Sequence, residues 1–306
     1  MNKTFIQLPL VSVVAISYNQ ERYVEETLNS IKAQTYPNIQ LIISDDGSTD
    51  NTKKIIAEWI AQNYSSAIFL NHSKNRGVNQ NYNSTIPCIK GEYVKLIGCD
   101  DVLLPDTIEI IMQKFFELPS DYGVIYGDMF RIDENSNLID EVGLIDKRGH
   151  PVFSGDVYQH MIKKPFITAA SIIFKKEVLD KLKCFNEKIF YEDHDFYLRA
   201  SKVCKFFFMP QGLVKYRVHA KSLINSSSKI KYFHNVFFVY LTNFDERIQY
   251  KKIYTERLLF CIKNFYALKF KRNSLFALKA FFKTGDLTFI KFAIASLPFY
   301  FSDNDL

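Results

Sequence analysis

Three short acidic clusters hold the residues of this 306-residue chain that are best suited to do chemistry: 44–50 (SDDGSTD), 98–101 (GCDD) and 191–195 (YEDHD). A carboxylate fixed at a strand end can accept hydrogen bonds from a base or a ribose. Two adjacent carboxylates need a compensating cation, such as a divalent ion that also binds diphosphate oxygens. A carboxylate at a helix start can serve as a general base. Each cluster also has a structural explanation, because polar turns and helix N-termini favour the same residue types.

The elements that must position these clusters alternate between strands and helices through the first 130 residues. Apolar, β-branched runs predict buried strands over 11–16, 41–43, 67–70, 93–97 and 124–129. Helical spacing and helix-start signals predict helices over 21–34, 50–62, 78–88 and 105–117, with Asp50 as a helix N-cap. This order indicates an α/β fold with a mostly parallel central sheet flanked by helices. Ligands of such sheets bind beyond the carboxyl ends of the strands, where the first two clusters stand.

The alternation stops after residue 130. Residues 131–165 are polar and rich in turn formers, which indicates a hairpin or a loop excursion. We expect a strand over 168–174, a short helix over 175–183 and a helix over 192–202, followed by apolar runs at 206–208 and 214–218. The third acidic cluster therefore lies at the start of a helix.

Several classes of protein are disfavoured. The sequence has no GxGxxG after a strand, no GxxxxGK[ST] and no GxSxG, so the dinucleotide, P-loop and nucleophile-elbow signatures are missing. None of the five cysteines forms a CxxC pair, which is typical of free thiols in a reducing compartment. We find neither a signal peptide nor an apolar run of about 18 residues, and therefore expect a cytoplasmic protein.

The last part of the chain has a different composition. Residues 226–306 hold 13 Lys and Arg against 6 Asp and Glu, and 14 of the 28 Phe. Phe, Leu, Lys and Arg are mixed over 265–283, and a helix of that composition could lie on an anionic bilayer surface. The same residues could instead pack as a subdomain against the catalytic body or a second copy of the chain. We do not expect a nucleic-acid partner.

The segment 11–52 resembles the opening of the family 2 glycosyltransferases. Further motifs follow in the family's order: Asn75-Arg76-Gly77, Gly91-Glu92-Tyr93, Asp100-Asp101, Glu192-Asp193 and Tyr216-Arg217-Val218-His219. The resemblance implies the GT-A fold, with a catalytic domain over 1–225 and an α-helical, basic and aromatic C-terminal region over 226–306. Within the catalytic domain it implies a nucleotide-binding half over about 9–130 and an acceptor-binding half over 131–225.

The resemblance also implies an activity, the inverting transfer of a sugar from a nucleotide diphosphate, expected to be UDP, to an acceptor hydroxyl. For the donor it implies that Tyr18 packs on the nucleobase, Asp46 hydrogen-bonds the base, and Asp100 contacts the ribose or sugar. It implies a divalent cation, Mn²⁺ or Mg²⁺, held by Asp101 and His219. Cys99 stands where many relatives carry Asp, so the first acid of a full DxD motif is missing.

For the transfer step itself, the resemblance implies that Asp193 is the catalytic base. The expected acceptor is a glycan or a lipid-linked molecule of bacterial surface polysaccharide or glycan synthesis, reached at the inner face of the plasma membrane. Two alternatives remain open, a non-catalytic nucleotide-sugar-binding or scaffold protein of the same fold and a nucleotidyltransferase. The set Asp46, Asp101, Asp193 and His219 favours an enzyme over the scaffold, while a nucleotidyltransferase would be distinguished by its product, pyrophosphate instead of a nucleoside diphosphate.

Overall fold

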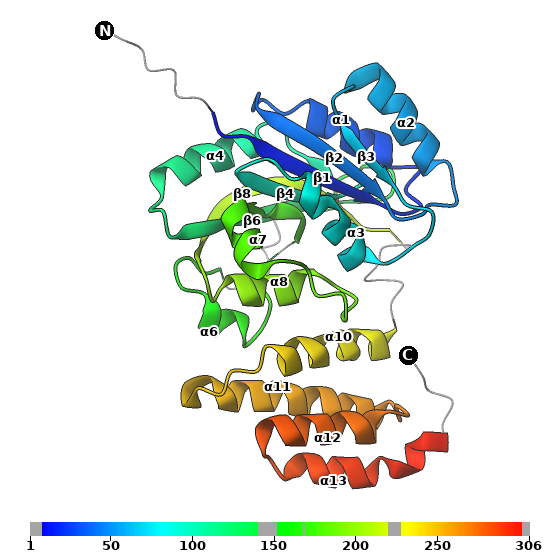
Figure 1. Ribbon diagram of the computed structural model, residues 1–306, viewed down its shortest axis with the longest axis vertical. Helices are drawn as coiled ribbons and strands as arrows, with labels where there is room; N and C mark the ends of the chain where they lie inside the picture. Colours follow the sequence, from blue (N-terminus) through cyan, green and yellow to red (C-terminus); the bar gives the residue numbers. More distant parts are fainter. Residues whose placement is uncertain (1–7, 140–151, 168, 220–227, 302–306) are drawn as a thin grey trace. The chain divides into compact units, whose positions relative to one another are not determined.

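The computed structural model describes residues 8–139, 152–167, 169–219 and 228–301. It divides into two compact units (Figure 1). The first comprises Met1–Val157, Phe166–Phe185 and Ala200–His219, and the second comprises Tyr158–Pro165, Asn186–Arg199 and Ala220–Leu306. Two short segments that precede residue 225 are therefore grouped with the C-terminal helices.

The first unit is built on one eight-stranded sheet with the order β3-β2-β1-β4-β7-β6-β8-β5. Its strands are β1 (Val11–Ser17), β2 (Ile39–Asp45), β3 (Ile68–Asn71), β4 (Tyr93–Gly98), β5 (Val102–Leu103), β6 (Tyr122–Ile132), β7 (Ile173–Lys175) and β8 (Lys205–Arg217). β1 pairs in parallel with β2 and β4, β2 with β3, and β6 with β8. β7 is antiparallel to both β4 and β6, and β5 is antiparallel to β8. The predicted parallel arrangement is confirmed for β1 to β4, and the whole sheet is mixed.

Helices cover this sheet as the α/β prediction requires. They are α1 (Val24–Lys32), α2 (Thr52–Asn63), α3 (Val78–Thr85), α4 (Thr107–Glu117) and α7 (Lys176–Leu182), with short 3₁₀ turns η1 (Ile86–Cys88) and η2 (Ala169–Ser171). Alternate residues of β1, such as Val13, share one core with α1, α2 and α4 through side chains such as Leu28, Ile56 and Ile111. The opposite face of β2 contacts α3, where the Ser44 hydroxyl donates to Asn81 Oδ1 at 2.6 Å. Period-two alternation thus sets which helices lie on which face.

Two local expectations differ from the structure, and a third, the hairpin or loop excursion over 131–165, agrees with the part of it that is described. The helix expected to be capped by Asp50 has Asn51 at its N-cap position, although Asp50 Oδ1 still accepts from Thr52 N at 3.0 Å. Within the strand expected over 168–174, residues 169–171 form a 3₁₀ turn and the three-residue β7 begins at Ile173, while residue 168 lies outside the described part. In the segment 131–165, Ile132 and Leu138 form an antiparallel bridge, and the short helix α6 (Tyr158–Met161) follows; residues 140–151 lie outside the described part.

The second unit is helical. Besides α6 it contains α8 (Asp193–Ala200), α10 (Lys229–Thr242), α11 (Ile248–Ala267), α12 (Asn273–Thr284), α13 (Thr288–Ala295) and the 3₁₀ turn η3 (Leu297–Phe301). The helices α10 to α13 lie side by side (Figure 1). Their aromatic side chains pack on one another: Phe276 stacks on Phe237 at 5.1 Å between ring centroids and meets Phe265 at 5.6 Å. The predicted helical C-terminal region is confirmed, and much of its Phe content forms its own core.

No helix in the described ranges is long and apolar enough to cross a membrane.

This aromatic core generates a matched prediction on one helix. Phe276→Ala removes a buried ring and should lower the free energy of unfolding by about 3–5 kcal/mol. Phe282→Ala, in the same helix, removes a ring that is 81% exposed and should change it by less than about 0.5 kcal/mol. Urea unfolding followed by circular dichroism measures both. Equal effects of the two substitutions would contradict the packing described for α12.

Candidate active site

The carboxyl ends of three parallel strands meet at one edge of the sheet. Ser17 of β1 lies opposite Asp45 of β2, and Ile16 lies opposite Gly98 of β4. Beyond the strands, Asp46 N donates to Ser17 O and Cys99 N donates to Ile16 O, both at 2.9 Å. The parallel pairing therefore brings the clusters 44–50 and 98–101 to opposite sides of the end of β1.

The buried Asp45 carboxylate organises the first of these loops. It accepts hydrogen bonds from the Ser17 hydroxyl at 2.8 Å, from Ser48 N at 2.8 Å and from the Ser48 hydroxyl at 2.5 Å. Gly47 in the same loop has φ +77, and a Cβ there would meet the backbone of Lys74 at 2.4 Å. The loop can therefore adopt this path only with glycine at position 47.

Asp46 ties this loop to the Asn75-Arg76-Gly77 motif. Its carboxylate is buried, with Oδ1 accepting from Arg76 N at 3.0 Å and Oδ2 accepting from Gly77 N at 2.8 Å. Each carboxylate oxygen has a second lone pair, so both can still accept a further donor. These two motifs are separate in sequence, and the structure joins them through the side chain of Asp46.

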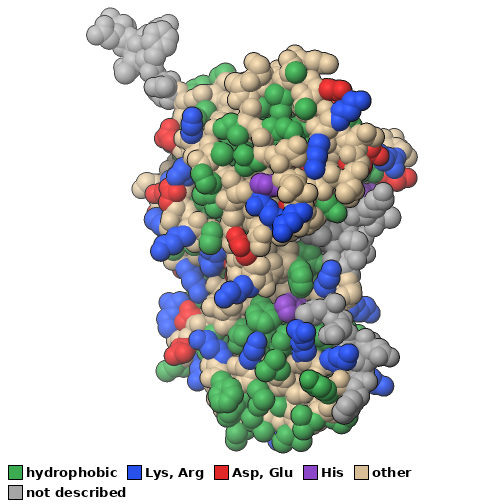
Figure 2. All heavy atoms as spheres, turned by 45° about the vertical axis from the view of Figure 1, so that its right-hand side comes forward, with side chains coloured by type: hydrophobic (Ala, Val, Ile, Leu, Met, Phe, Trp, Pro, Cys, Tyr) green, Lys and Arg blue, Asp and Glu red, His purple; other side chains and the backbone are tan. Residues whose placement is uncertain are grey.

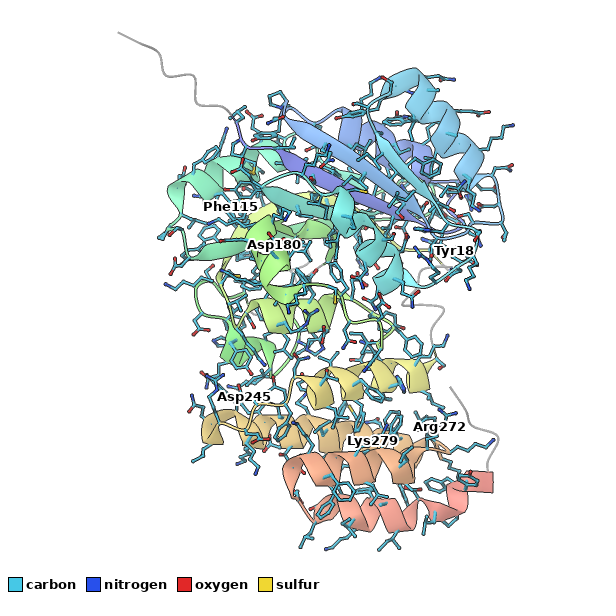
Figure 3. The ribbon with its side chains drawn as sticks, viewed as in Figure 1. Tyr18, Phe115, Asp180, Asp245, Arg272 and Lys279 are labelled. Carbon is cyan, nitrogen blue, oxygen red and sulfur yellow. The ribbon has the colours of Figure 1, made fainter. Side chains whose placement is uncertain are left out.

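Tyr18 is the aromatic side chain at the same edge (Figure 3). It follows β1 directly and is 44% exposed. The next residue, Asn19, has φ +54 and receives Thr49 N on Oδ1 at 2.8 Å, while its own N–H donates to the Ser48 hydroxyl at 2.8 Å. The backbone around Tyr18 is therefore fixed to the Asp46 loop while the ring itself stays accessible for stacking.

Asp100 and His219 lie together although they are 119 residues apart in sequence. His219 Nε2 is 3.2 Å from Asp100 Oδ2, and the His219 ring lies 5.1 Å from that of Tyr23. The sequence prediction paired His219 with Asp101 as metal ligands, whereas the structure sets it against Asp100. The position of His219 at the end of β8 follows from the parallel pairing of β8 with β6.

Asp101 is buried and held by the end of β8. Its Oδ1 accepts from Arg217 N at 3.0 Å, and its backbone oxygen accepts from the Thr27 hydroxyl at 2.7 Å. Burial and the neighbouring Asp100 charge raise the pKa of Asp101 well above its ordinary value. A cation beside Asp100 and Asp101 would stabilise the charged form of Asp101 and oppose this rise of its pKa.

The side-chain atoms at this edge are of the type that binds a hard divalent ion, but too few of them are grouped together to complete its coordination. Carboxylate oxygens and an imidazole nitrogen suit Mn²⁺ or Mg²⁺. Among the described residues, no three His, Cys, Asp or Glu side chains are grouped so that they could hold a metal. The side chains of Asp100, Asp101 and His219 therefore do not form a ready-made site, and those that bind an ion could supply only part of its coordination shell, with diphosphate oxygens and water as the other ligands.

Two buried cations support this edge, and sequence reasoning gave neither a role. The Arg217 side chain is 1% exposed; Nε donates to Asp100 O at 2.8 Å, Nη1 donates to Asp133 O at 3.0 Å, and the guanidinium pairs with Glu26. Lys95 of β4 is fully buried, donates to Ala170 O, and has its pKa lowered to about 7 by burial. For Lys95, the sequence signal that could have been used is a lysine within an otherwise apolar strand.

The third acidic cluster belongs to the second unit and begins α8. Asp193 Oδ1 accepts from His194 N at 2.6 Å, and Glu192 O accepts from Phe196 N at 3.0 Å. Burial raises the pKa of Asp193, and burial together with the Asp193 charge raises that of Glu192. A carboxylate whose pKa is raised toward neutrality is a better proton acceptor than an ordinary one.

The role of Arg217 can be tested by stability. Arg217→Met should lower the free energy of unfolding by more than about 2 kcal/mol, because the carbonyls of Asp100 and Asp133 lose their donor. Arg22→Met removes an ion pair to Glu134 in which both side chains are more than half exposed, and should cost less than about 0.5 kcal/mol. Chemical denaturation compares them, and an equal, small loss would contradict the supporting role of Arg217.

Comparison with known proteins identifies the family of the chain. The model of the family described as glycosyl transferase family 2 matches residues 12–183, more than half of the chain. An uncharacterized glycosyltransferase of Methanocaldococcus jannaschii is 28% identical over 226 residues, covering 73% of this chain and 75% of that protein. Glycosyltransferase GlyG of Streptococcus pneumoniae is 29% identical over 232 residues, covering 71% and 73%.

Solved structures share the fold at low sequence identity. S. aureus TarS 1–349 in complex with UDP-GlcNAc has a TM-score of 0.65 at 16% identity, covering 96% of this chain and 92% of that one. The mannosyltransferase PcManGT of Pyrobaculum calidifontis, in complex with GDP-Man and Mn²⁺, has a TM-score of 0.61 at 14% identity, covering 96% and 86%. The fold, the ordered motifs and the family match lead to one conclusion: the chain is a glycosyltransferase of the GT-A fold and belongs to glycosyl transferase family 2.

Proposed function

We propose that the protein transfers a sugar from a nucleotide-diphosphate donor, UDP-linked in the first instance, to an acceptor hydroxyl with inversion at the anomeric carbon. The observation that carries this proposal is the gathering of Tyr18, Asp46, Asp100 and His219 at one edge of the sheet, from four separate parts of the chain. The nucleotide sugars bound by TarS and PcManGT support the donor class.

The donor roles follow from the contacts at that edge. The exposed Tyr18 ring offers a flat apolar surface to a nucleobase. Asp46 is held by two backbone N–H groups, and its remaining lone pairs can accept a base N–H. Asp100 Oδ1 can accept a ribose or sugar hydroxyl, since its other oxygen faces His219. Together these three side chains would fix the donor by its nucleotide and its sugar.

A divalent cation is proposed at the same place, with oxygens of the donor and water completing its coordination. Asp100, Asp101 and His219 would hold it with the donor diphosphate, and the Mn²⁺ in PcManGT supports such a need. When bound, the ion would act as a Lewis acid that offsets the negative charge of the leaving diphosphate. The chain's own part is to keep two carboxylates close together, and Arg217 does this by donating from its side chain to the backbone oxygen of Asp100 and from its backbone N–H to the carboxylate of Asp101.

Asp193 is the proposed catalytic base. Its raised pKa suits a group that takes the proton of the attacking acceptor hydroxyl near neutral pH. A single base and a single displacement give inversion, as in hydrolases that invert. A nucleotidyltransferase would release pyrophosphate instead of a nucleoside diphosphate, and a scaffold protein would bind the donor without turnover, so the product separates the three possibilities.

Substitution of the base tests this proposal. Asp193→Asn should lower the rate of nucleoside-diphosphate release, measured across a panel of nucleotide sugars, by about 100- to 10,000-fold while donor binding in calorimetry is kept. The wild-type rate should rise with pH through a midpoint above the ordinary Asp value of about 3.9, because the base must lose its proton. Asp180→Asn, at a surface carboxylate paired with Lys176, should change neither quantity (Figure 3). Near-normal turnover of Asp193→Asn would refute the assignment.

The last helices present a surface that suits a lipid-linked acceptor. Five large apolar side chains on them are 60–81% exposed: Phe282, Leu287, Ile294, Leu297 and Tyr300. Lys and Arg side chains lie beside this apolar surface (Figure 2), and residues 263–291 contain seven Lys and Arg against one acidic residue. Apolar side chains bordered by cations match an anionic bilayer. A two-fold interface between copies would instead set like charges against each other.

We therefore propose that α12, α13 and η3 bind the inner face of a bacterial plasma membrane, where a glycan or lipid-linked acceptor of surface polysaccharide synthesis is available.

Vesicle binding tests this surface. The protein should sediment with vesicles that contain phosphatidylglycerol, less so at high salt and less with neutral vesicles. The pair Phe282→Ser and Lys291→Glu should abolish sedimentation, because it removes an exposed ring and reverses a charge. Lys54→Glu, at an exposed surface lysine of α2, is the matched control and should sediment normally. Equal binding of both variants would contradict the surface, and mass that grows with protein concentration would indicate an interface between copies.

A further inference from the structure

The segment that carries Asp193 lies along α10, the first helix of the C-terminal region. The ring of Phe190 lies 5.4 Å from that of His234, and the ring of His194 lies 5.4 Å from that of Tyr240. The chain order is the same on both sides, so the segment 190–195 follows α10 toward its C-terminal end. Asp193 lies between these two aromatic contacts in sequence.

Before Asp193, one amide side chain orders two consecutive peptide groups. Asn235 Oδ1 accepts from Phe190 N at 2.8 Å and from Tyr191 N at 3.0 Å. Asn235 is 3% exposed, so water does not compete for this oxygen. Neither N–H lies within α8, and Asn235 satisfies both with a single acceptor.

After Asp193, a second amide side chain of α10 fixes the first turn of α8. Asn243, the C-cap residue of α10, donates from Nδ2 to Asp195 Oδ1 at 2.8 Å and to Val239 O at 2.9 Å. The other oxygen of Asp195 accepts from Arg199 Nε at 2.7 Å. The Asp195 carboxylate is 1% exposed, so its position depends on these two donors.

We infer that Asn235 and Asn243 are positioning residues that hold the catalytic base, one on each side of Asp193. This inference rests on the proposed function of Asp193. Both residues lie beyond 12–183, the range matched by the family model. The C-terminal region would then do more than provide a membrane surface, because its first helix sets the geometry of proton transfer. A misplacement of about 1 Å at a reacting group costs on the order of 100-fold in rate.

The two asparagines differ in hydrogen-bond direction, because Asn235 accepts hydrogen bonds from the segment and Asn243 donates one to it. The same substitution should therefore have different effects at the two positions. Asn235 acts only as an acceptor toward the segment, and a carboxylate oxygen can replace its amide oxygen. Asn243 acts as a donor toward a carboxylate, and a second carboxylate there would repel Asp195. Substitution of asparagine by aspartate should therefore change kcat little at position 235 and lower it strongly at position 243, although the side chain changes shape in the same way at both positions.

The experiment compares Asn235→Leu, Asn235→Asp and Asn243→Asp in the full-length protein. Asn235→Leu and Asn243→Asp should each lower kcat for nucleoside-diphosphate release about 10- to 100-fold, with the donor KM within about twofold of wild type. Asn235→Asp should keep kcat within about threefold. Asn273→Leu is the matched control: Asn273 is a fully buried asparagine of α12 that donates to the Ser296 hydroxyl at 2.8 Å, so its loss should reduce stability but not kcat.

Amide hydrogen exchange provides a readout that needs no turnover. The N–H groups of Phe190 and Tyr191 should be protected in the wild type and in Asn235→Asp, and should exchange faster in Asn235→Leu. Unchanged exchange in Asn235→Leu would overturn the inference. So would a loss of kcat in Asn235→Leu and Asn243→Asp no larger than that in Asn273→Leu. If Asp193→Asn kept its activity, the proposed function itself would fail; if only the asparagine variants kept theirs, the positioning role alone would fail.

Discussion

The parallel register of β1 with β2 and β4 is the constraint on which the donor side of the site depends. It aligns Ser17 with Asp45 and Ile16 with Gly98, so the next residues of three strands emerge at one edge. A shift of one residue in either pairing would turn the side chains of that strand to the opposite face. The backbone bonds from Asp46 to Ser17 and from Cys99 to Ile16 extend the alignment past the strands into the loops.

The carboxylates of Asp100 and Asp101 repel each other electrostatically. Buried basic side chains and backbone N–H groups lie beside them and reduce this repulsion. Arg217 contacts the backbone of Asp100 through its side chain and the carboxylate of Asp101 through its N–H. Burial lowers the pKa of Lys95 to about 7, while the Asp101 charge acts in the opposite direction. These groups place hydrogen-bond donors and positive charge beside two acids that follow one another at a strand end.

Much of the fold and of this edge could be predicted because the signals are local. Buried runs such as 11–16 and 41–43 and the helical spacing between them correspond to β1, β2 and α1, and parallel strands place the acids that follow them together. The two-residue β5 and the three-residue β7 were not predictable in the same way, because such short strands contain too few residues to show a period. Their pairing is set by neighbouring strands instead.

The supporting residues of the site were the part that sequence patterns could not supply. The roles of Arg217, Asn235 and Asn243 arise from contacts between segments that are distant in sequence, and an Asn within an aromatic helix carries no signal of what its amide meets. The pairing of His219 with Asp100 likewise depends on the path of β8. Single motifs thus predicted the candidate acids, while the residues that contact them became visible only in three dimensions.

The central claim is that the carboxyl edge of β1, β2 and β4 binds a nucleoside diphosphate. The most direct measurement is a crystal structure of the protein with UDP and Mn²⁺. We expect the uracil on the Tyr18 ring with a base N–H at Asp46, the ribose near Asp100, and the ion between the diphosphate and the side chains of Asp100, Asp101 and His219. Density for UDP at any other surface, or none at concentrations that saturate related transferases, would contradict it.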